Sequence, residues 1–259
     1  MDANNKTIKI TVITVCFNAE KHIEGAIQSV LVQTYPNIEY IIVDGASTDG
    51  TLVIVEKYKD RIYKIVSEKD RGIYDAMNKG VQLATGDVVY FLNADDRLFN
   101  ANVIADIVKV FNTHKEADLV IGKVEPVNMP ASFLSNKREY QGECLSKAQL
   151  LINGLCHQRV FAKTNLFKRI GFLKWTLRYS ADFDWILRAY KSKAVVVRTD
   201  CCVAFYDVNG FSTRNWWGAI SDHAHVVFCN ANLFEFIFYL IYVSLRKIIR
   251  TLKFWLKRT

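Results

Sequence analysis

Proline, paired cysteines and glycine-rich phosphate loops are scarce or missing in this chain. Its 259 residues include 3 prolines and 6 cysteines, and no two cysteines form a CxxC pair. Without metal-type spacing, the cysteines favour a reducing compartment over a zinc site or a disulfide scaffold. Neither GxGxxG nor GxxxxGKS/T occurs, which excludes the phosphate loops typical of dehydrogenases and P-loop ATPases. The N-terminal sequence MDANNKTIKI lacks the zones of a signal peptide, so we expect a cytoplasmic domain.

Positive charge is concentrated at the C-terminal end. The net charge is +8, and residues 231–259 hold six basic residues and one acidic residue, which is +5 of that total. The uncharged run 236–245 is only about half as long as a membrane-spanning helix. Beyond it, helical spacing separates an apolar face from a basic one, with Leu245, Ile248, Ile249, Leu252 and Trp255 against Arg246, Arg250, Lys253 and Lys257. Such a helix is typical of an anionic membrane surface, although packing on its own domain or on a second copy remains an alternative.

Short β-branched runs alternate with amphipathic stretches through the first half of the chain. The pattern predicts strands at 10–15, 38–43, 62–66 and 87–92, and helices at 20–33, after 47–50, at 72–84 and at 101–113. Further on it predicts a strand at 117–122, a helix at 181–192 and a strand at 194–199. Residues 124–155 are ambiguous and 200–230 have no clear assignment. The alternating order indicates an α/β fold, a mostly parallel sheet with helices on both faces.

Polar or acidic side chains follow each of the first four predicted strands. They are Asn18, then Asp44, then Glu68 and Asp70, then the segment 93–96. Ligands of open parallel sheets bind at the carboxyl ends of the strands, so these groups would meet in one cleft. Gathered carboxylates repel each other unless a cation compensates, and a divalent ion with oxygen ligands fits best. An acidic cleft also argues against nucleic acid as a partner. The alternative is that each acid is a cap or turn residue, as we expect for Asp49.

Four separated motifs resemble the family-2 glycosyltransferases with the GT-A fold. They are TVITVCFNAE, IEYIIVDGASTDGT, SEKDRGIYDAMNKG and ATGDVVYFLNADD, in the family's order and spacing over residues 8–115. VDGASTDGT and GIYDAMNKG resemble the subgroup that builds bacterial O-antigen and exopolysaccharide units. The match weakens between 120 and 150 and returns at HQRVF, YSADFDWILRAY and GFST.

The resemblance implies a GT-A-like, Rossmann-type open mixed sheet flanked by helices over residues 1–225. The charge and helical spacing of the remaining residues predict a basic amphipathic membrane-associating tail at 226–259. It implies that Asp95, in the family's DxD position, is the ligand of Mg²⁺ or Mn²⁺ that holds the donor diphosphate. Asn93 replaces the first acid of that motif. Asn18, Asp44 and Asp75 would contact the nucleotide-sugar donor, expected to be a UDP-sugar. Gly45 stands where many members carry a second acid for the nucleobase.

The same resemblance implies that Asp182 is the general base of an inverting transfer. An acceptor hydroxyl is a poor nucleophile, so a carboxylate must take its proton as it attacks the anomeric carbon. His157 lies in a motif of the subgroup and is expected to contact the acceptor or a phosphate. Asp184 is expected to be a cap or a solvated residue. The QxxRW motif of processive members has only a poor counterpart at 214–216, which predicts addition of one sugar.

These features predict a glycosyltransferase on the inner face of the cell membrane, where a polyprenyl-diphosphate-linked or other glycan acceptor is at hand. Two alternatives remain at this point. A catalytically silent nucleotide-sugar-binding or interaction module at the membrane is kept open by Asn93. A nucleotidyltransferase uses similar acids on a similar sheet, but would normally carry a glycine-rich basic loop near the first strand.

Overall fold

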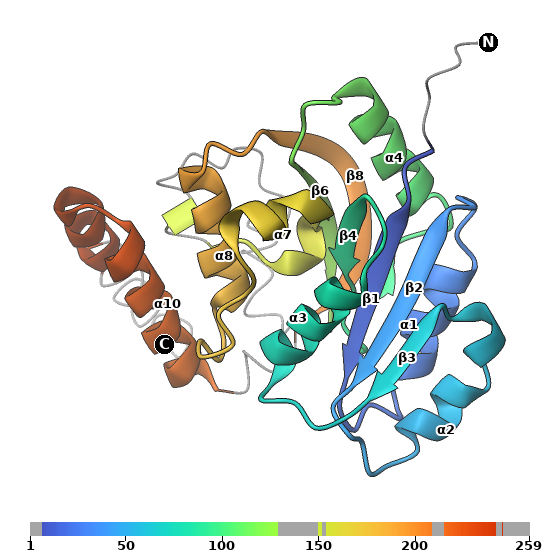
Figure 1. Cartoon of the computed structure of the whole chain (residues 1–259). Coiled ribbons are helices and arrows are strands. Elements are labelled where there is room, and N and C mark those ends of the chain that lie inside the picture. Colours follow the sequence, from blue (N-terminus) through green and yellow to red (C-terminus); the bar gives the residue numbers. More distant parts are fainter. Residues whose placement is uncertain (1–6, 129–149, 152–153, 209–214, 242–244, 246–259) are drawn as a thin grey trace, which may run out of the picture.

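The computed structural model describes residues 7–128, 150–151, 154–208, 215–241 and 245. Its centre is a sheet with the strand order β3-β2-β1-β4-β7-β6-β8-β5 (Figure 1). The first four strands in this order are mutually parallel: β3 (Lys64–Ser67), β2 (Ile38–Asp44), β1 (Ile10–Cys16) and β4 (Val88–Phe91). Their carboxyl ends therefore meet at one edge of the sheet.

The remaining strands make the sheet mixed. β7 (Val160–Lys163) lies antiparallel to β4 and to β6 (Leu119–Val127). β8 (Val196–Asp207) runs parallel to β6, and the short β5 (Arg97–Leu98) pairs antiparallel with β8. The sheet is thus open and mixed, which confirms the fold class predicted from the sequence.

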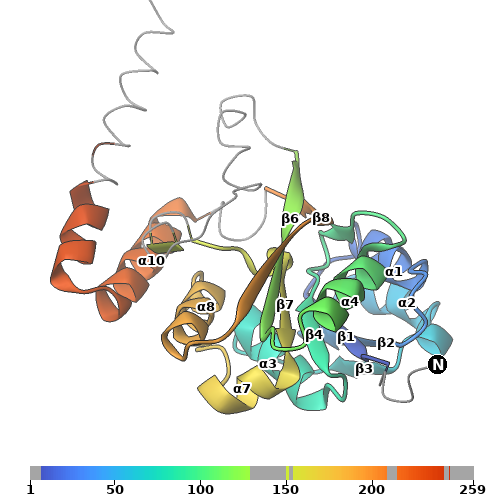
Figure 2. The ribbon, with the colours of Figure 1, turned by 90° about the horizontal axis from the view of Figure 1, so that it is seen from above.

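Helices cover both faces of this sheet. One face carries α1 (Ile23–Leu31), α2 (Thr51–Glu56) with the 3₁₀ turn η1 (Lys59–Arg61), and α4 (Val103–Thr113). The other face carries α3 (Ile73–Leu83), α7 (Thr164–Ile170) and α8 (Ala181–Lys191). Seen from above, the two sets lie on opposite sides of the strands (Figure 2). A second 3₁₀ turn, η3 (His157–Arg159), leads into β7.

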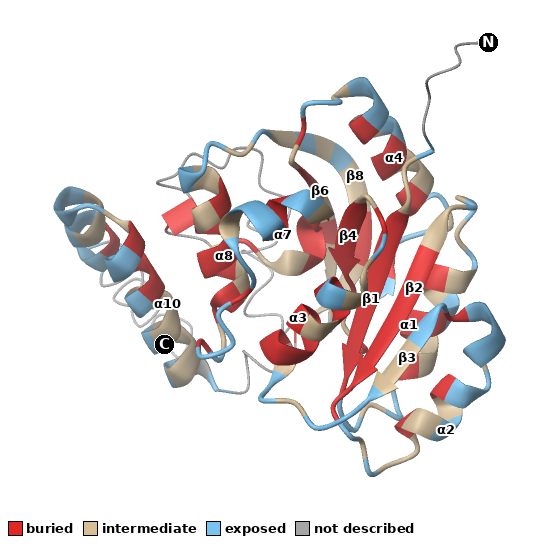
Figure 3. Cartoon of the chain, in the orientation of Figure 1, coloured by how far each residue is buried: buried red, intermediate tan, exposed pale blue. Residues whose placement is uncertain are grey.

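The core has two apolar layers because side chains alternate along each strand. In β1, Ile10 and Val12 pack under α1 and α4, whereas Ile13 and Val15 face α3 and α8. The central strands are accordingly buried on both faces (Figure 3). Gly80 allows α3 to lie close to β1, since a Cβ at this position would come within 2.4 Å of Ile13 Cγ2.

The helix α10 (Trp216–Asn230) packs against α8 and the loop before it. The carboxylate of Asp222 accepts a hydrogen bond from the backbone N–H of Tyr179 at 2.8 Å. The ring of His223 stacks on Phe183 with the centroids 4.4 Å apart. A further helical segment at 233–241 follows α10. α10 therefore supports the segment from which α8 begins.

The predicted elements of the first half are all present, with shifted ends. β3 begins two residues later than expected, and α1 is shorter than 20–33. Residues 200–230, unassigned from the sequence, form the end of β8 and the helix α10, except for 209–214, which lie outside the described residues. The expected domain boundary at 225/226 falls within α10, and the division into two domains stays a prediction. Among the described helices, none combines the length and apolar character needed to cross a membrane.

Candidate active site

The loops after β1 and β2 are joined by Asn18 and Asp44. Asn18 has a left-handed backbone (φ 48°), its N–H donates to Ser47 Oγ at 2.8 Å, and its side-chain oxygen accepts from Thr48 N at 2.9 Å. Asp44 is fully buried and accepts from Ser47 N at 2.9 Å and Ser67 Oγ at 2.7 Å. The two predicted donor residues therefore lie in one hydrogen-bonded corner at the carboxyl ends of β1, β2 and β3.

Asp70 occupies the space beside Gly45. A Cβ added at Gly45 would lie 2.6 Å from Asp70 Oδ2 and 3.4 Å from the Phe17 ring. Any side chain at position 45 would displace the Asp70 carboxylate. Gly45 thus replaces the acid that many family members carry after Asp44, and the Asp70 carboxylate lies next to Gly45.

The segment after β4 places two neighbouring carboxylates in different surroundings. Asp96 is buried, accepts from Gln158 Nε2 at 2.9 Å and from Asp207 N at 3.1 Å, and has its pKa raised to about 7 by burial and by Asp95. It therefore ties β4 to η3 and β8. The Asp95 carboxylate is half-buried, and no described side chain donates a hydrogen bond to it. Burial, and then the charge of Asp207, raise the pKa of Asp95.

Asp95 fits a divalent cation better than Asp96 does. A bound cation would offset the desolvation and like-charge repulsion at Asp95. Within the described ranges, no three acidic, histidine or cysteine side chains converge as a closed metal cage.

A second network surrounds Asp182, in the first turn of α8. Its Oδ2 lies 3.0 Å from His157 Nδ1, and its Oδ1 accepts from the Tyr74 hydroxyl at 3.0 Å and from Phe183 N at 2.9 Å. On its other side, His157 Nε2 lies 3.2 Å from Asn93 Oδ1. The structure thus brings together three predicted site residues, Asn93, His157 and Asp182, in one continuous chain of contacts.

The surroundings of Asp182 keep it ionised. Burial acts to raise its pKa, but the hydrogen bond and charge of His157, the Phe183 N–H and the Tyr74 hydroxyl outweigh burial and lower the pKa below its ordinary value. Asp182 is therefore a carboxylate at neutral pH. This is the state that a proton acceptor requires. Through His157 it is linked to Asn93, two residues before Asp95.

Asp75 pairs with Arg71 at the start of α3. It is buried in the first turn of α3, where it accepts from Arg71 N at 3.0 Å and from the Arg71 guanidinium at 2.7 Å. This pairing lowers the pKa of Asp75. The Arg71 guanidinium in turn lies over the ring of Trp175, 3.9 Å from its centroid. Contact of Asp75 with a donor stays a prediction.

The expectation that Asp184 is a cap or solvated is wrong. Its side chain is 2% exposed and pairs with Lys174 at 2.9 Å and Arg188 at 2.8 Å. Asp184 therefore holds the loop before α8 against the helix.

Sequence reasoning also missed Tyr74, whose place in the helical pattern of 72–84 marks it as an ordinary core aromatic. The hydroxyl of Tyr74 donates to Asp182, which lies 108 residues further along the chain, so the sequence pattern gives no sign of the contact.

An open hollow lies away from these residues. A space of about 910 Å³ opens at the amino end of β4, where Gly86, Lys163 and Lys168 are among its lining residues. None of the networks described above reaches it. Chemistry, and not volume, therefore places the candidate site at the carboxyl edge of the parallel strands.

Comparison with known proteins identifies the family. The family model described as Glycosyl transferase family 2 matches residues 11–191. The chain belongs to glycosyl transferase family 2. The match spans the Asn18, Asp44 and Asp95 segments and both partners of the His157–Asp182 pair. The resemblance seen in the sequence is thereby confirmed.

Relatives of this family 2 glycosyltransferase include mycobacterial enzymes. A PGL/p-HBAD biosynthesis glycosyltransferase of Mycobacterium bovis is 32% identical over 191 residues, covering 73% of this chain and 72% of that protein. An uncharacterized glycosyltransferase of Mycobacterium tuberculosis is 29% identical over 215 residues, covering 79% of this chain and 77% of that protein.

Two solved structures have the same fold as this family 2 glycosyltransferase. Residues 1–349 of Staphylococcus aureus TarS, in complex with UDP-GlcNAc, superpose with a TM-score of 0.67 at 23% identity, covering 87% of this chain and 68% of that one. The mannosyltransferase PcManGT of Pyrobaculum calidifontis, in complex with GDP-Man and Mn²⁺, gives 0.63 at 18% identity, covering 93% and 81%. At these identities the likeness shows the GT-A-like fold.

Proposed function

We propose that this glycosyltransferase transfers one sugar, with inversion, from a UDP-sugar to a lipid-linked saccharide in surface polysaccharide biosynthesis, using Mg²⁺ or Mn²⁺. The observation that carries the proposal is the chain of contacts Asn93–His157–Asp182. It joins the DxD segment to an ionised carboxylate. The TarS and PcManGT complexes support a nucleotide-sugar donor and a divalent cation.

On the donor side, Asn18 and Asp44 shape the corner that would hold the nucleoside, and Asn93 presents its amide to the ribose or to His157. Asp95 would bind the metal, which on binding would offset the charge that develops on the departing nucleoside diphosphate. Asp75 holds Arg71 near the start of α3. In this arrangement the protein positions the donor and supplies a single carboxylate for the cation.

On the acceptor side, Asp182 takes the proton. The acceptor oxygen attacks the anomeric carbon as its O–H proton moves to the Asp182 carboxylate. The bond from the anomeric carbon to the diphosphate oxygen breaks, and the nucleoside diphosphate leaves with that electron pair. One in-line displacement inverts the anomeric configuration. Tyr74 and His157 fix the direction of the carboxylate throughout.

A membrane location is supported by exposed apolar side chains at the end of the described chain. Leu233 is 71% exposed, Phe234 84% and Phe238 57%. Contiguous apolar surface of this kind marks an interaction site. The basic residues that follow in the sequence favour an anionic bilayer as its partner. We therefore propose a peripheral position on the inner face of the cell membrane, beside a polyprenyl-diphosphate-linked or similar acceptor.

The test is a panel of nucleotide sugars incubated with the protein and Mn²⁺, Mg²⁺ or EDTA. We expect slow release of one nucleoside diphosphate that needs the metal and is lost in Asp95→Ala. Asp182→Asn should bind the same donor with unchanged affinity but transfer at least about 100-fold more slowly. Asp200→Asn, at a side chain that is 95% exposed, is the matched control and should behave as wild type.

Two results would contradict the proposal. If no donor binds in the presence of either metal, the chain is a silent module at the membrane. If Asp182→Asn keeps wild-type turnover, the base is another group.

A further inference from the structure

Trp175 is an exposed aromatic residue that the chemistry above does not use. It lies in the loop between α7 and α8 and keeps 41% of its surface exposed. Arg71 covers one side of the indole, with its Cζ 3.9 Å from the ring centroid, and Asp75 anchors Arg71 at 2.7 Å. The result is a stack, Asp75–Arg71–Trp175, whose outer layer is an indole with open surface.

The loop that carries Trp175 is held rigid by its neighbours. Leu173, two residues earlier, exchanges hydrogen bonds with the buried side chain of Asn78 at 2.8 and 3.0 Å. Lys174 pairs with the buried Asp184 at 2.9 Å. Arg188 of α8 donates to the carbonyl of Phe172 at 2.7 Å. Trp175 is therefore presented in one place, which reduces the entropy lost when a ligand binds to it.

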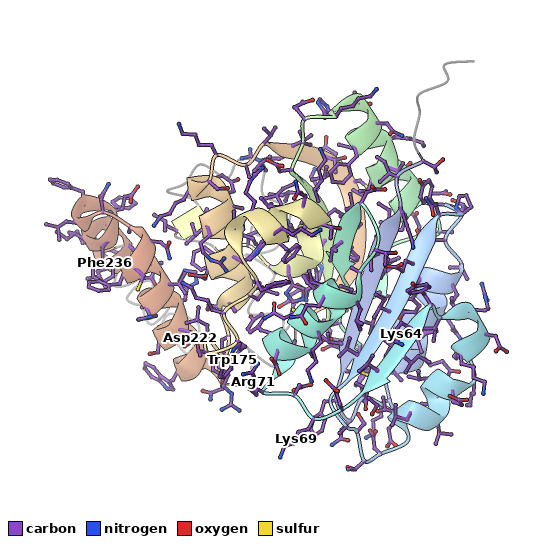
Figure 4. The ribbon with its side chains drawn as sticks, viewed as in Figure 1. Lys64, Lys69, Arg71, Trp175, Asp222 and Phe236 are labelled. Carbon is purple, nitrogen blue, oxygen red and sulfur yellow. The ribbon has the colours of Figure 1, made fainter. Side chains whose placement is uncertain are left out.

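The stack lies at the same edge as the proposed base. The loop leads directly into α8, whose first turn carries Asp182. α3, which begins just after Arg71, carries Tyr74, and the Tyr74 hydroxyl donates to Asp182. Figure 4 shows Arg71 and Trp175 beside each other at the lower edge of the molecule.

The two oxygens of Asp182 have different neighbours. Oδ2 faces His157 and, through it, Asn93 of the donor segment, whereas Oδ1 faces Tyr74 and α3. The stack belongs to the Tyr74 flank. A molecule lying on Trp175 would thus approach Asp182 from the Tyr74 side, with Asp75, the predicted donor contact, behind Arg71 in the stack.

We propose that Trp175, backed by Arg71, is the platform on which a sugar ring of the acceptor stacks. One face of a pyranose presents C–H groups that pack on an indole, whose face carries partial negative charge. The Arg71 side chain is 60% exposed, which leaves guanidinium N–H groups at the rim for hydroxyl or phosphate oxygens. The inference rests on the proposed transfer and adds to it that the acceptor is recognised through a saccharide ring.

The test separates acceptor use from donor use. Nucleoside diphosphate release is measured with water alone and with a panel of p-nitrophenyl glycosides as acceptor probes. Trp175→Ala should raise the KM for the accepted glycoside about tenfold or more and leave donor hydrolysis within about twofold of wild type. Trp175→Phe should keep most of the acceptor affinity. Phe172→Ala removes a ring of equal 41% exposure from the same loop and should leave both activities unchanged.

A second measurement needs no turnover. In the ¹⁵N spectrum, the indole signal of Trp175, assigned with Trp175→Phe, should shift when glycosides are added in the presence of UDP. The platform is overturned if no glycoside moves this signal, or if Trp175→Ala leaves the KM unchanged. It is equally overturned if Trp175→Ala slows donor hydrolysis as much as transfer. If the wild-type protein itself shows no donor hydrolysis, the result would instead count against the proposed function.

Discussion

Asp182 accepts hydrogen bonds from two side chains and one backbone N–H, and each donor stabilises its charged form. These hydrogen bonds make Asp182 a weaker base, but they keep its carboxylate ionised and fix its orientation. A carboxylate with a lowered pKa is a weaker proton acceptor, but it is charged at every pH at which the protein would work. The orientation comes from Tyr74 and His157, which lie on different elements.

Removing one of these donors should move the pH dependence of activity in a defined direction. Tyr74→Phe deletes the hydroxyl that donates to Asp182 Oδ1, so the pKa of Asp182 rises toward its ordinary value. Because the ionised form is the active one, the acidic limb of kcat/KM should shift to higher pH, and kcat should fall several-fold. A profile from about pH 3 to about pH 8 measures this, because the limb lies near or below the ordinary pKa of an aspartate.

Tyr63→Phe is the matched control. This tyrosine is 59% exposed and directly precedes β3, where its N–H donates to the Tyr40 carbonyl of β2. Its profile should overlay that of the wild type. An unchanged acidic limb in Tyr74→Phe would show that Tyr74 has no influence on the proton acceptor.

The helix α8 joins chemistry and stability within one turn. Asp182 faces the site, while Asp184, two residues on, turns to the other side and is buried against Lys174 and Arg188. Opposed directions are what helical geometry gives for residues two apart. The two acids of the ADFDW segment thus lie in separate surroundings, Asp182 in the proposed site and Asp184 in buried ion pairs.

Asp184→Asn should destabilise the protein strongly. The substitution leaves Arg188, whose side chain is 20% exposed, without its carboxylate partner, and loss of one partner of a buried pair costs about 3–5 kcal/mol. Chemical denaturation should show a lower midpoint with an unchanged slope. Asp106→Asn removes a carboxylate from the exposed pair with Lys109 and should change stability by about 0.5 kcal/mol or less. Equal stability of the two variants would refute the structural role of Asp184.

The four parallel strands could be predicted because each is a buried β-branched run bounded by polar residues. The start of β8 was predicted as the strand 194–199, but its continuation to Asp207 was not, because many of its side chains are half-buried and give no clean alternation. Asn18, Asp44 and Asp95 were found through their places after strands. The partnership of Asp182 with Tyr74 and His157 was not, because it depends on tertiary contacts across 108 and 25 residues. The fold thus follows from local periodicity, whereas the site's inner contacts require the assembled sheet.

A group of exposed apolar side chains lies on the helical segment 233–241. Phe234 and Phe238, on the helical segment 233–241, are exposed, whereas Tyr239 is 4% exposed and contacts the ring of His223. One side of this segment is therefore anchored to α10 while the other offers apolar side chains to a partner. The figures place it at the edge farthest from β3 (Figure 1).

Charging that surface should weaken membrane binding. Phe234→Glu places a carboxylate on the apolar side and opposes an anionic bilayer, so co-sedimentation with phosphatidylglycerol vesicles should fall at least about tenfold. Val53→Glu adds the same charge at a side chain that is 69% exposed on α2 and should bind as wild type. If both variants bind equally well, the rings of 233–241 do not contact lipid.

The contacts of α10 also determine where the chain can be shortened. Asp222 holds the backbone of Tyr179, and His223 stacks on Phe183, the residue next to the proposed base. A version trimmed before Trp216 would lose these two supports together with the apolar segment. One trimmed after Asn230 would keep these two supports and lose the apolar segment, together with the contact of Tyr239 with the ring of His223. The second cut site is therefore the better one for crystallisation or inhibitor screening. It removes the exposed apolar segment and keeps the contacts of α10 with Tyr179 and Phe183.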